Sequence, residues 1–322
     1  MRFTLSSEQR QFAASIGELL AAADVPTAVR SWADGVHGPG LKLWRSLADL
    51  GVTGLTVPSR LGGLDATAVD LAVAFDQLGY HAVPGPWVDS AAALPALLRG
   101  TEAGERLLPS LASGAALASV ALPPHVPYAL DADVAEVRIL IDGGQALRFT
   151  PGTMLSSVDG ARRLFPVSAD AVVTDDVAVE LAVDTAALAV AAQLTGAGRW
   201  LLDSSVAYAK QRSQYGKPIG QYQAVKHLLA DVATRLELAT PLVHGAAVAL
   251  TAGPAPRDVS AARVAAADAA YLAARTALQV HGAIGYTEEH PLGLWLTKVR
   301  ALVAAWGTQA FHRNRVLAAV AA

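Results

Sequence analysis

A polar stretch in the second half of the chain carries residue types suited to gripping a ligand. It reads RSQYGKPIGQYQAV over residues 212–225 and interrupts sequence rich in Ala, Leu and Val. Arg212 offers a planar charged fork, Tyr215 an aromatic face, and Gln214 and Gln223 amides that donate or accept hydrogen bonds. The Gly and Pro between them shape a tight turn. A loop of this composition between helices is also compatible with a plain turn, so alone it leaves both interpretations open.

A second polar connector, QVHGAIGYTEEHP, spans residues 279–291. Gln279 opens it, and Gly282 and Gly285 allow a ligand to approach the backbone closely. Its two histidines, His281 and His290, flank the glycines, but neither is accompanied by a second ligand at helical spacing, so the sequence predicts no metal site. The connector therefore presents polar groups and exposed backbone rather than a metal centre.

The composition limits the possible partners. Of 322 residues 53% are hydrophobic and only 16% are charged, with a net charge of −3. So little charge leaves apolar surface to bury between subunits, and we expect an oligomer. The near-neutral charge without basic runs argues against nucleic acid. The absence of Cys fits a cytoplasmic protein, the N-terminus lacks the apolar core of a signal peptide, and no apolar run reads as a membrane span.

Helical periodicity dominates residues 1–115. Ser6 and Gln9 form a capping-box pattern, so the first helix should start near Ser7. Further helices are expected at LKLWRSLADLG, ending on Gly51, and at TAVDLAVAFDQLG, ending on Gly79.

The pattern changes to short β-branched segments near residue 116. ALASVAL, VAEVRILI, ALRFT, DAVV and VAVELAV are separated by turn residues and predict a small β domain over 116–183. Long helices are expected afterwards at 185–211, 222–250, 257–281 and 291–320, and HRNR at 312–315 reads as a solvated helix end. The predicted fold class is α+β and mainly α: an N-terminal helical domain (1–115), a shortened middle β domain (116–183) and a C-terminal four-helix bundle (184–322).

Several of these segments together resemble the acyl-CoA dehydrogenase family. The two polar connectors look like its C-terminal signatures, LWRSLADLGVTGLTVPSRLGG resembles its N-terminal connector, and SSVDGARRL resembles the end of its middle β domain. The resemblance implies this family's three-domain fold, a tetrameric assembly, bound FAD, an acyl-CoA substrate and an electron-transfer flavoprotein as redox partner. The implied reaction is α,β-dehydrogenation of the acyl thioester.

The resemblance also assigns cofactor-binding roles. The loop at Arg212, Gln214 and Tyr215 would reach across a subunit boundary to the ADP half of a neighbour's FAD. The other residues implied in cofactor binding are Gln223, Gln279, Gly282, Gly285 and Thr308. In the first β strands the family's Thr-Glu and Gly-Ser-Asp segment is missing, because LASVALPPHVPYALDADV stands there. Contacts to the flavin ring are therefore expected to be lost while those to the adenosine end are kept.

Both positions at which the family places its catalytic base hold other residues. Twenty-seven positions beyond Gln279 the Glu of a Glu-Gly-Thr triplet is replaced by Trp306, and twenty-six positions before Arg212 stands Ala186. Trp accepts no proton from carbon and would fill space that a thioester needs. The remaining candidates are weak: Asp184, read as a strand-end or helix-start residue, and Glu288 or Glu289 in the second connector.

The leading hypothesis from the sequence is one subunit of a heteromeric acyl-CoA dehydrogenase. This chain would hold the adenosine end of FAD in trans, and a second acyl-CoA dehydrogenase-like subunit would supply the catalytic Glu. The alternatives are a flavin-free scaffold of the same fold, in which Trp306 plugs a dead pocket, and a self-sufficient acyl-CoA enzyme with an atypical base.

Overall fold

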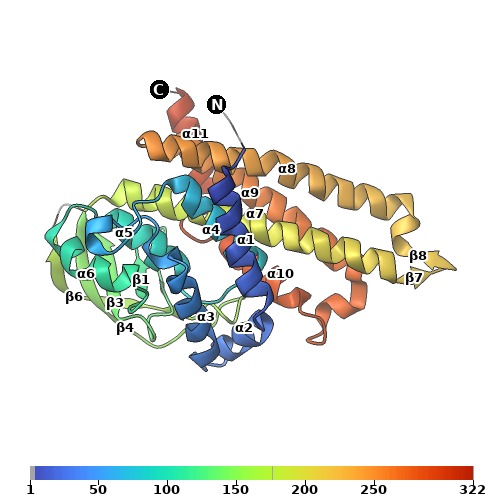
Figure 1. The fold of residues 1–322 in the computed structure, drawn as a ribbon, viewed down its shortest axis with the longest axis horizontal. Helices are drawn as coiled ribbons and strands as arrows, with labels where there is room; N and C mark the ends of the chain where they lie inside the picture. Colours follow the sequence, from blue (N-terminus) through green and yellow to red (C-terminus); the bar gives the residue numbers. More distant parts are fainter. Residues whose placement is uncertain (1–3, 176, 322) are drawn as a thin grey trace.

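The N-terminal helices begin where the sequence predicts. The computed structural model describes residues 4–175 and 177–321, and Figure 1 shows its helical and β parts. Helix α1 starts at Ser7 with a reciprocal capping box between Ser6 and Gln9, as expected. The helices of this part are α1 (Ser7–Ala21), α2 (Val25–Ala33), α3 (Gly38–Asp49), η1 (Val52–Gly54), η2 (Ser59–Leu61), α4 (Ala68–Tyr80), η3 (Asp89–Ala93), α5 (Leu94–Leu97) and α6 (Glu102–Ala112).

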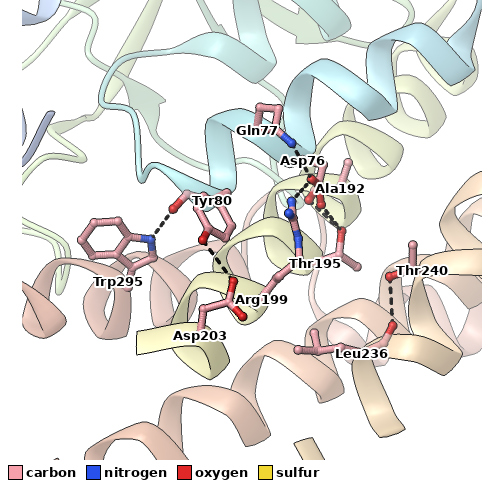
Figure 2. A network of polar contacts seen from close by, with 10 residues as sticks. All are labelled: Asp76, Gln77, Tyr80, Ala192, Thr195, Arg199, Asp203, Leu236, Thr240 and Trp295. Atoms are coloured by element: carbon pink, nitrogen blue, oxygen red, sulfur yellow. Dashed lines mark hydrogen bonds and ion pairs between the residues drawn. The ribbon is translucent and has the colours of Figure 1, made fainter. Parts of the chain in front are cut away.

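Helix α4 ends one residue beyond its predicted end at Gly79. The chain does turn at Gly51, two residues after α3, with φ of 84°, but α4 continues through Gly79 to Tyr80. Gly79 is needed for close packing, because a Cβ there would lie 2.0 Å from the carbonyl oxygen of Gln193. Polar contacts bridge the same interface in Figure 2, where Asp76 pairs with Arg199.

The middle of the chain forms one small mixed sheet. Its strands are β1 (Ala118–Ala121), β3 (Val137–Asp142), β4 (Gln145–Pro151) and β6 (Val167–Thr174), in the order β1-β3-β4-β6. β1 and β3 run parallel, and the other pairs run antiparallel. The short strands β2 (Ala129–Leu130) and β5 (Leu164–Phe165) pair separately. Four of the five expected β segments are confirmed.

The fifth expected strand, VAVELAV, is wrong, because α7 (Val179–Gln211) already begins within it. Most of the first twenty residues of α7 are buried, so the apolar run shows no one-sided helical period. A continuous apolar run of this kind does not distinguish a buried helix from a buried strand.

The C-terminal part is a bundle of long helices. These are α7, α8 (Gln223–Ala252), α9 (Pro256–His281), α10 (Leu292–Leu302) and α11 (Gln309–Ala321), with η4 (Ile219–Gln221), η5 (Gly282–Tyr286) and the hairpin β7–β8 (Ser213–Gln214, Lys217–Pro218) between them. The expected single helix over 291–320 is wrong. It breaks into α10 and α11 because Trp306 and Gly307 have φ of 53° and 103°, which no α-helix accommodates.

Helix α7 forms the centre of the bundle. It is long and apolar enough to cross a membrane, but 94% of its most apolar window is buried inside the fold. It contacts α4, α8, α9 and α10, and the yellow-green ribbon of Figure 1 runs between them. Burial from all sides explains its composition, as in the core helix of a folded domain.

Candidate functional site

The hairpin β7–β8 projects from one end of the bundle (Figure 1). Its turn residues, Tyr215 and Gly216, have φ of 51° and 81°, as a type I′ hairpin turn requires. Tyr215 is 95% exposed although a Tyr at positive φ is strained. The hydroxyl of Tyr222 donates to the carbonyl of Gln214 at 3.1 Å, and Lys217 lies 4.3 Å from the centre of the Tyr222 ring. Contacts with Tyr222 therefore stabilise the turn, and the side chain of Tyr215 extends into solvent.

Arg212 and the other predicted cofactor residues on this loop are exposed. Arg212 lies at the C-terminal cap of α7. Within residues 4–175 and 177–321 no side chain hydrogen-bonds its guanidinium. Gln214 and Gln223 are also exposed. The loop thus offers a charged fork, amides and an aromatic ring to a binding partner.

The second polar connector lies at the same end of the bundle. The ring of Tyr208, near the end of α7, stacks on that of His281 at a centroid distance of 4.5 Å, which joins the base of the hairpin to the end of α9. Gln279 is exposed, and Gly282 has φ of 63° with open space where a Cβ would point. Gly285 instead packs within the chain, since a Cβ there would lie 3.1 Å from Leu292. Fold geometry therefore brings the two connectors together.

The position expected for a catalytic base faces a cavity. Trp306 is 4% exposed and lines a cavity of about 530 Å³ between the β domain and α10. Its indole Nε1 donates to Oδ1 of Asp89 at 3.0 Å. Oδ2 of Asp89 accepts from the backbone N–H of Val120 at 3.0 Å. The base position is thus occupied by an indole, and a carboxylate from a different element lies directly behind it.

Asp89 was not expected from the sequence. It lies on the π-helix η3, is 2% exposed and lines the same cavity. Burial raises the pKa of Asp89 to about 6, although the hydrogen bonds from Val120 and Trp306 and the charge of Arg162 oppose the rise. The sequence did contain a signal for Asp89, since it is a single acidic residue in the apolar run WVDSAAAL. An Asp in such a run is expected to be buried, and buried carboxylates need partners.

The segment that carries Trp306 is held from behind. Arg263, 1% exposed, donates to the carbonyls of Leu302, Val303 and Ala305 at 2.6, 3.2 and 3.1 Å, which caps the end of α10. Burial lowers the pKa of Arg263 to about 9. Arg263 stands alone as a cation in the Ala-rich run AARVAAADAA, and this isolation is the sequence signal for a buried Arg that caps a helix end.

His312 holds the same segment from α11. It is fully buried, lies 3.0 Å from the carbonyl of Trp306 through Nε2 and 3.2 Å from the hydroxyl of Ser260 through Nδ1. Burial and the charge of Arg263 lower its pKa to about 4, so a neutral ring donates to the carbonyl. The expectation that HRNR is a solvated helix end is only partly right, because the segment lies in the first turns of α11, with Arg313 and Asn314 exposed but His312 buried.

The weak base candidates do not reach this cavity. Asp184 lies inside α7 and pairs with Arg315 at 2.7 Å, so its interpretation as a strand-end or helix-start residue is wrong. Ala186 is buried in the same helix. Glu288 and Glu289 are exposed in the second connector.

Thr308 serves the local backbone. Its hydroxyl accepts from the N–H of Phe311 at 3.2 Å, at the start of α11. Among the described residues no group of three or more His, Asp or Glu could hold a metal ion.

Comparison with known proteins identifies the family. The acyl-CoA dehydrogenase C-terminal domain matches residues 177–321, and the N-terminal domain matches residues 6–115. The chain belongs to the acyl-CoA dehydrogenase family. Membership supports an oxidoreductase acting on CH–CH bonds and implies FAD as the cofactor.

Relatives match along almost the whole chain. The acyl-CoA dehydrogenase IpdE2 of Mycobacterium tuberculosis is 32% identical over 92% of both chains. IpdE2 of Mycolicibacterium smegmatis is 31% identical over 98% of this chain and 100% of its own. Butyryl-CoA dehydrogenase from Megasphaera elsdenii has the same fold, with a TM-score of 0.85, 21% identity and 100% of each chain covered. The predicted fold class and family are confirmed.

Proposed function

We propose that this chain is one subunit of a cytoplasmic, FAD-dependent acyl-CoA dehydrogenase, acting with a second, unlike subunit of the same family. Arg212, Gln214, Tyr215 and Gln223 would bind the ADP half of an FAD whose ring lies in the partner. From the second connector, Gln279 and Gly282 would complete the contact, whereas Gly285 packs within the chain and the hydroxyl of Thr308 accepts from the N–H of Phe311.

The exposed hairpin carries the proposal. Tyr215 has a positive φ and its side chain is almost fully exposed, so packing against the other described residues does not account for its strained backbone. The guanidinium of Arg212, which has no side-chain partner among the described residues, lies at the base of the same hairpin and suits a bidentate contact to pyrophosphate. The exposed ring of Tyr215 suits stacking on the adenine of the cofactor, and the guanidinium of Arg212 suits its phosphates.

The division of roles between the two subunits follows from the cavity at Trp306. Trp306 accepts no proton from carbon, so the partner would supply the Glu that takes the α-proton. FAD, when bound, accepts the β-hydrogen as hydride. An electron-transfer flavoprotein would then reoxidise it.

The test is flavin content of the assembled complex. The chain is co-expressed with a neighbouring-gene partner, and the visible flavin band is compared for wild type and Arg212→Ala. Arg257→Ala is the matched control, because Arg257 is an exposed Arg near the opposite end of α9. Loss of flavin from Arg212→Ala alone supports the proposal, whereas unchanged flavin favours a scaffold role. A lone chain that holds full flavin and reduces it with an acyl-CoA refutes the heteromer.

A second candidate, a self-sufficient enzyme with an atypical base, is favoured by Asp89. Its carboxylate lines the cavity at Trp306, and burial brings its pKa to about 6, close to working pH for a general base. Asp89→Asn would then stop exchange of the substrate α-proton with solvent. Asp131→Asn is the control, because Asp131 is also buried and hydrogen-bonded to an indole, that of Trp32 at 3.1 Å, but does not line the cavity. Equal exchange in both variants rejects this candidate.

A further inference from the structure

Strand β6 forms one edge of the mixed sheet, and no strand lies beyond it (Figure 1). Its sequence, VSADAVVT, contains no Lys, Arg or Pro, the residues that commonly protect an edge strand from pairing. Among the described residues β4 is its one strand partner. The backbone N–H and C=O groups that β6 directs away from β4 are therefore open to pairing with another extended segment.

The side chains of β6 are also uncovered. Those of residues 168–172 are exposed, although a strand of a folded domain ordinarily buries one face. Val172 is 53% exposed, whereas Ile139 on β3 is 2% exposed. Two register shifts interrupt the pairing of β6 with β4, but paired residues extend along the strand from Val167 to Thr174. The whole strand is thus held in the sheet with its outer side open.

Three arginines lie beside this edge. Arg106 from α6, Arg138 from β3 and Arg148 from β4 line a groove of about 400 Å³ together with residues 171–173 of β6. Arg106 and Arg148 are exposed, and Arg138 is half-buried. In the part of the chain that the structure describes, none of the three forms an ion pair. Their charges are therefore left for a partner to neutralise.

The carboxylates nearest to the arginines are already engaged. Glu136, which lines the groove, accepts from the backbone N–H of Leu117 at 2.7 Å. Asp170 on β6 accepts from the hydroxyl of Thr150 at 2.9 Å. Three arginines against one Glu leave the groove with two positive charges, whereas the whole chain carries −3. This local charge complements an acidic ligand.

The register of the sheet places the arginines where an added strand would present its side chains. Arg148 lies opposite Ile139, so both project from one face of the sheet, and α6 contacts β6 beside the same groove. Neighbouring strands lie about 4.8 Å apart, so a strand added to β6 would lie about 10 Å from β4. An Arg and an acidic side chain span that distance together. Ala171, which lines the groove between them, is too small to separate them.

We propose that the outer edge of β6 pairs with an extended, acidic segment of the second subunit, whose carboxylates contact Arg106, Arg138 and Arg148. This inference rests on the proposed function for the existence of that subunit and adds a place where the two chains join. Backbone hydrogen bonds along β6 supply affinity, and the arginines select the segment by its charge. The surface is separate from the hairpin assigned to FAD, because β6 and β7–β8 lie at opposite ends of the molecule (Figure 1).

The first measurement is amide hydrogen exchange in the co-expressed complex. The amides of β6 are compared with those of β4, which has a strand on each side. Protection of β6 similar to that of β4 is expected, because a paired edge strand has no open amides. Alternate β6 amides that exchange about ten-fold or more faster than those of β4 show an open edge and overturn the inference.

The second measurement identifies the segment that pairs with β6. Arg106→Lys and Arg148→Lys keep the positive charge and supply an amine, which a carbodiimide joins to a carboxylate in contact with it. Arg45→Lys on α3 is the control, since Arg45 is exposed and outside the groove. Cross-links from either groove variant to an acidic segment of the second subunit, found by mass spectrometry and absent from the control, support the inference. Cross-links to a second copy of this chain, or to no other chain, overturn it.

Charge reversal measures the contribution of the arginines. Arg106→Glu combined with Arg148→Glu is expected to weaken association of the subunits about ten- to hundred-fold, measured as dissociation of the complex on dilution. Arg45→Glu should leave association unchanged, and unchanged protection of the β4 amides in the double variant shows that the sheet stays folded. Unchanged association of the double variant overturns the inference.

The flavin band, recorded on the same samples, separates the two proposals. A complex that shows the β6 cross-links but holds no flavin refutes FAD binding alone. A complex with full flavin and an open β6 edge refutes only the present inference.

Discussion

Replacing Trp306 by Phe removes the indole N–H that donates to Asp89 and keeps an aromatic ring in the cavity. In the native chain this hydrogen bond of 3.0 Å stabilises the ionised carboxylate. The same hydrogen bond stabilises the protonated carboxyl less. The substitution therefore raises the pKa of Asp89 further above its native value of about 6.

The direction of the pH dependence follows from proton linkage. In wild type the pKa of Asp89 rises from 3.8 to about 6 on folding, so the native state binds the extra proton between these values. The contribution of Asp89 to the free energy of unfolding then falls by about 3 kcal/mol as the pH rises from 3.8 to about 6, and this contribution is constant outside that window.

In the variant this fall continues to higher pH. A charge-assisted hydrogen bond contributes about 1.5 to 3 kcal/mol, which corresponds to a further rise in the pKa of Asp89 of about one to two. Relative to wild type, an added loss of that size develops above about pH 6 and is nearly absent at about pH 5.

The assay is urea unfolding of wild type and variant at about pH 5 and about pH 8. Trp295→Phe is the matched control. Trp295 is equally buried, but its indole donates to the neutral carbonyl of Tyr80 at 2.9 Å. Its loss should be the same at both pH values. A loss in Trp306→Phe that is also independent of pH refutes the electrostatic link between Trp306 and Asp89.

The remaining predictions concern packing, capping and the hairpin. Gly79→Ala forces a methyl group against the carbonyl of Gln193 and should lower the free energy of unfolding by about 2 kcal/mol or more. Gly293→Ala is the control, because open space surrounds that position and no such loss is expected. Thermal melting of both variants measures the difference. Arg263→Met removes the donor to three carbonyls and should lower the free energy of unfolding by about 3 kcal/mol. Amide hydrogen exchange after α10 should become faster, and unchanged exchange would contradict a capping role. Tyr215→Gly relieves positive φ and should stabilise the isolated chain by about 0.5 to 1 kcal/mol while weakening flavin retention in the complex; weaker stability would show that the exposed ring packs within the chain.

The elements that sequence reasoning predicted well have one-sided patterns or explicit end signals. The capping box at Ser6 placed the start of α1, and the turn-bounded β-branched runs placed four strands. The errors lie where tertiary packing overrides those signals. Gly79 looks like a helix end but serves the close approach of α4 to α7, and VAVELAV enters a helix buried from all sides.

The candidate site divides in the same way. The sequence indicated the two polar connectors and the missing bases, because ligand-binding loops differ sharply in composition from an Ala-rich bundle. It did not indicate Asp89, Arg162 or Arg300, since these residues lie far apart in the chain and meet only around the cavity.

By itself, then, the sequence determined the family, the order of helical and β parts, and the polar loops, since local periodicity and motif spacing are properties of neighbouring residues. Only the tertiary structure decided what surrounds Trp306. Burial and charge at that cavity depend on elements that are more than two hundred residues apart, as the hydrogen bond between Asp89 and Trp306 shows.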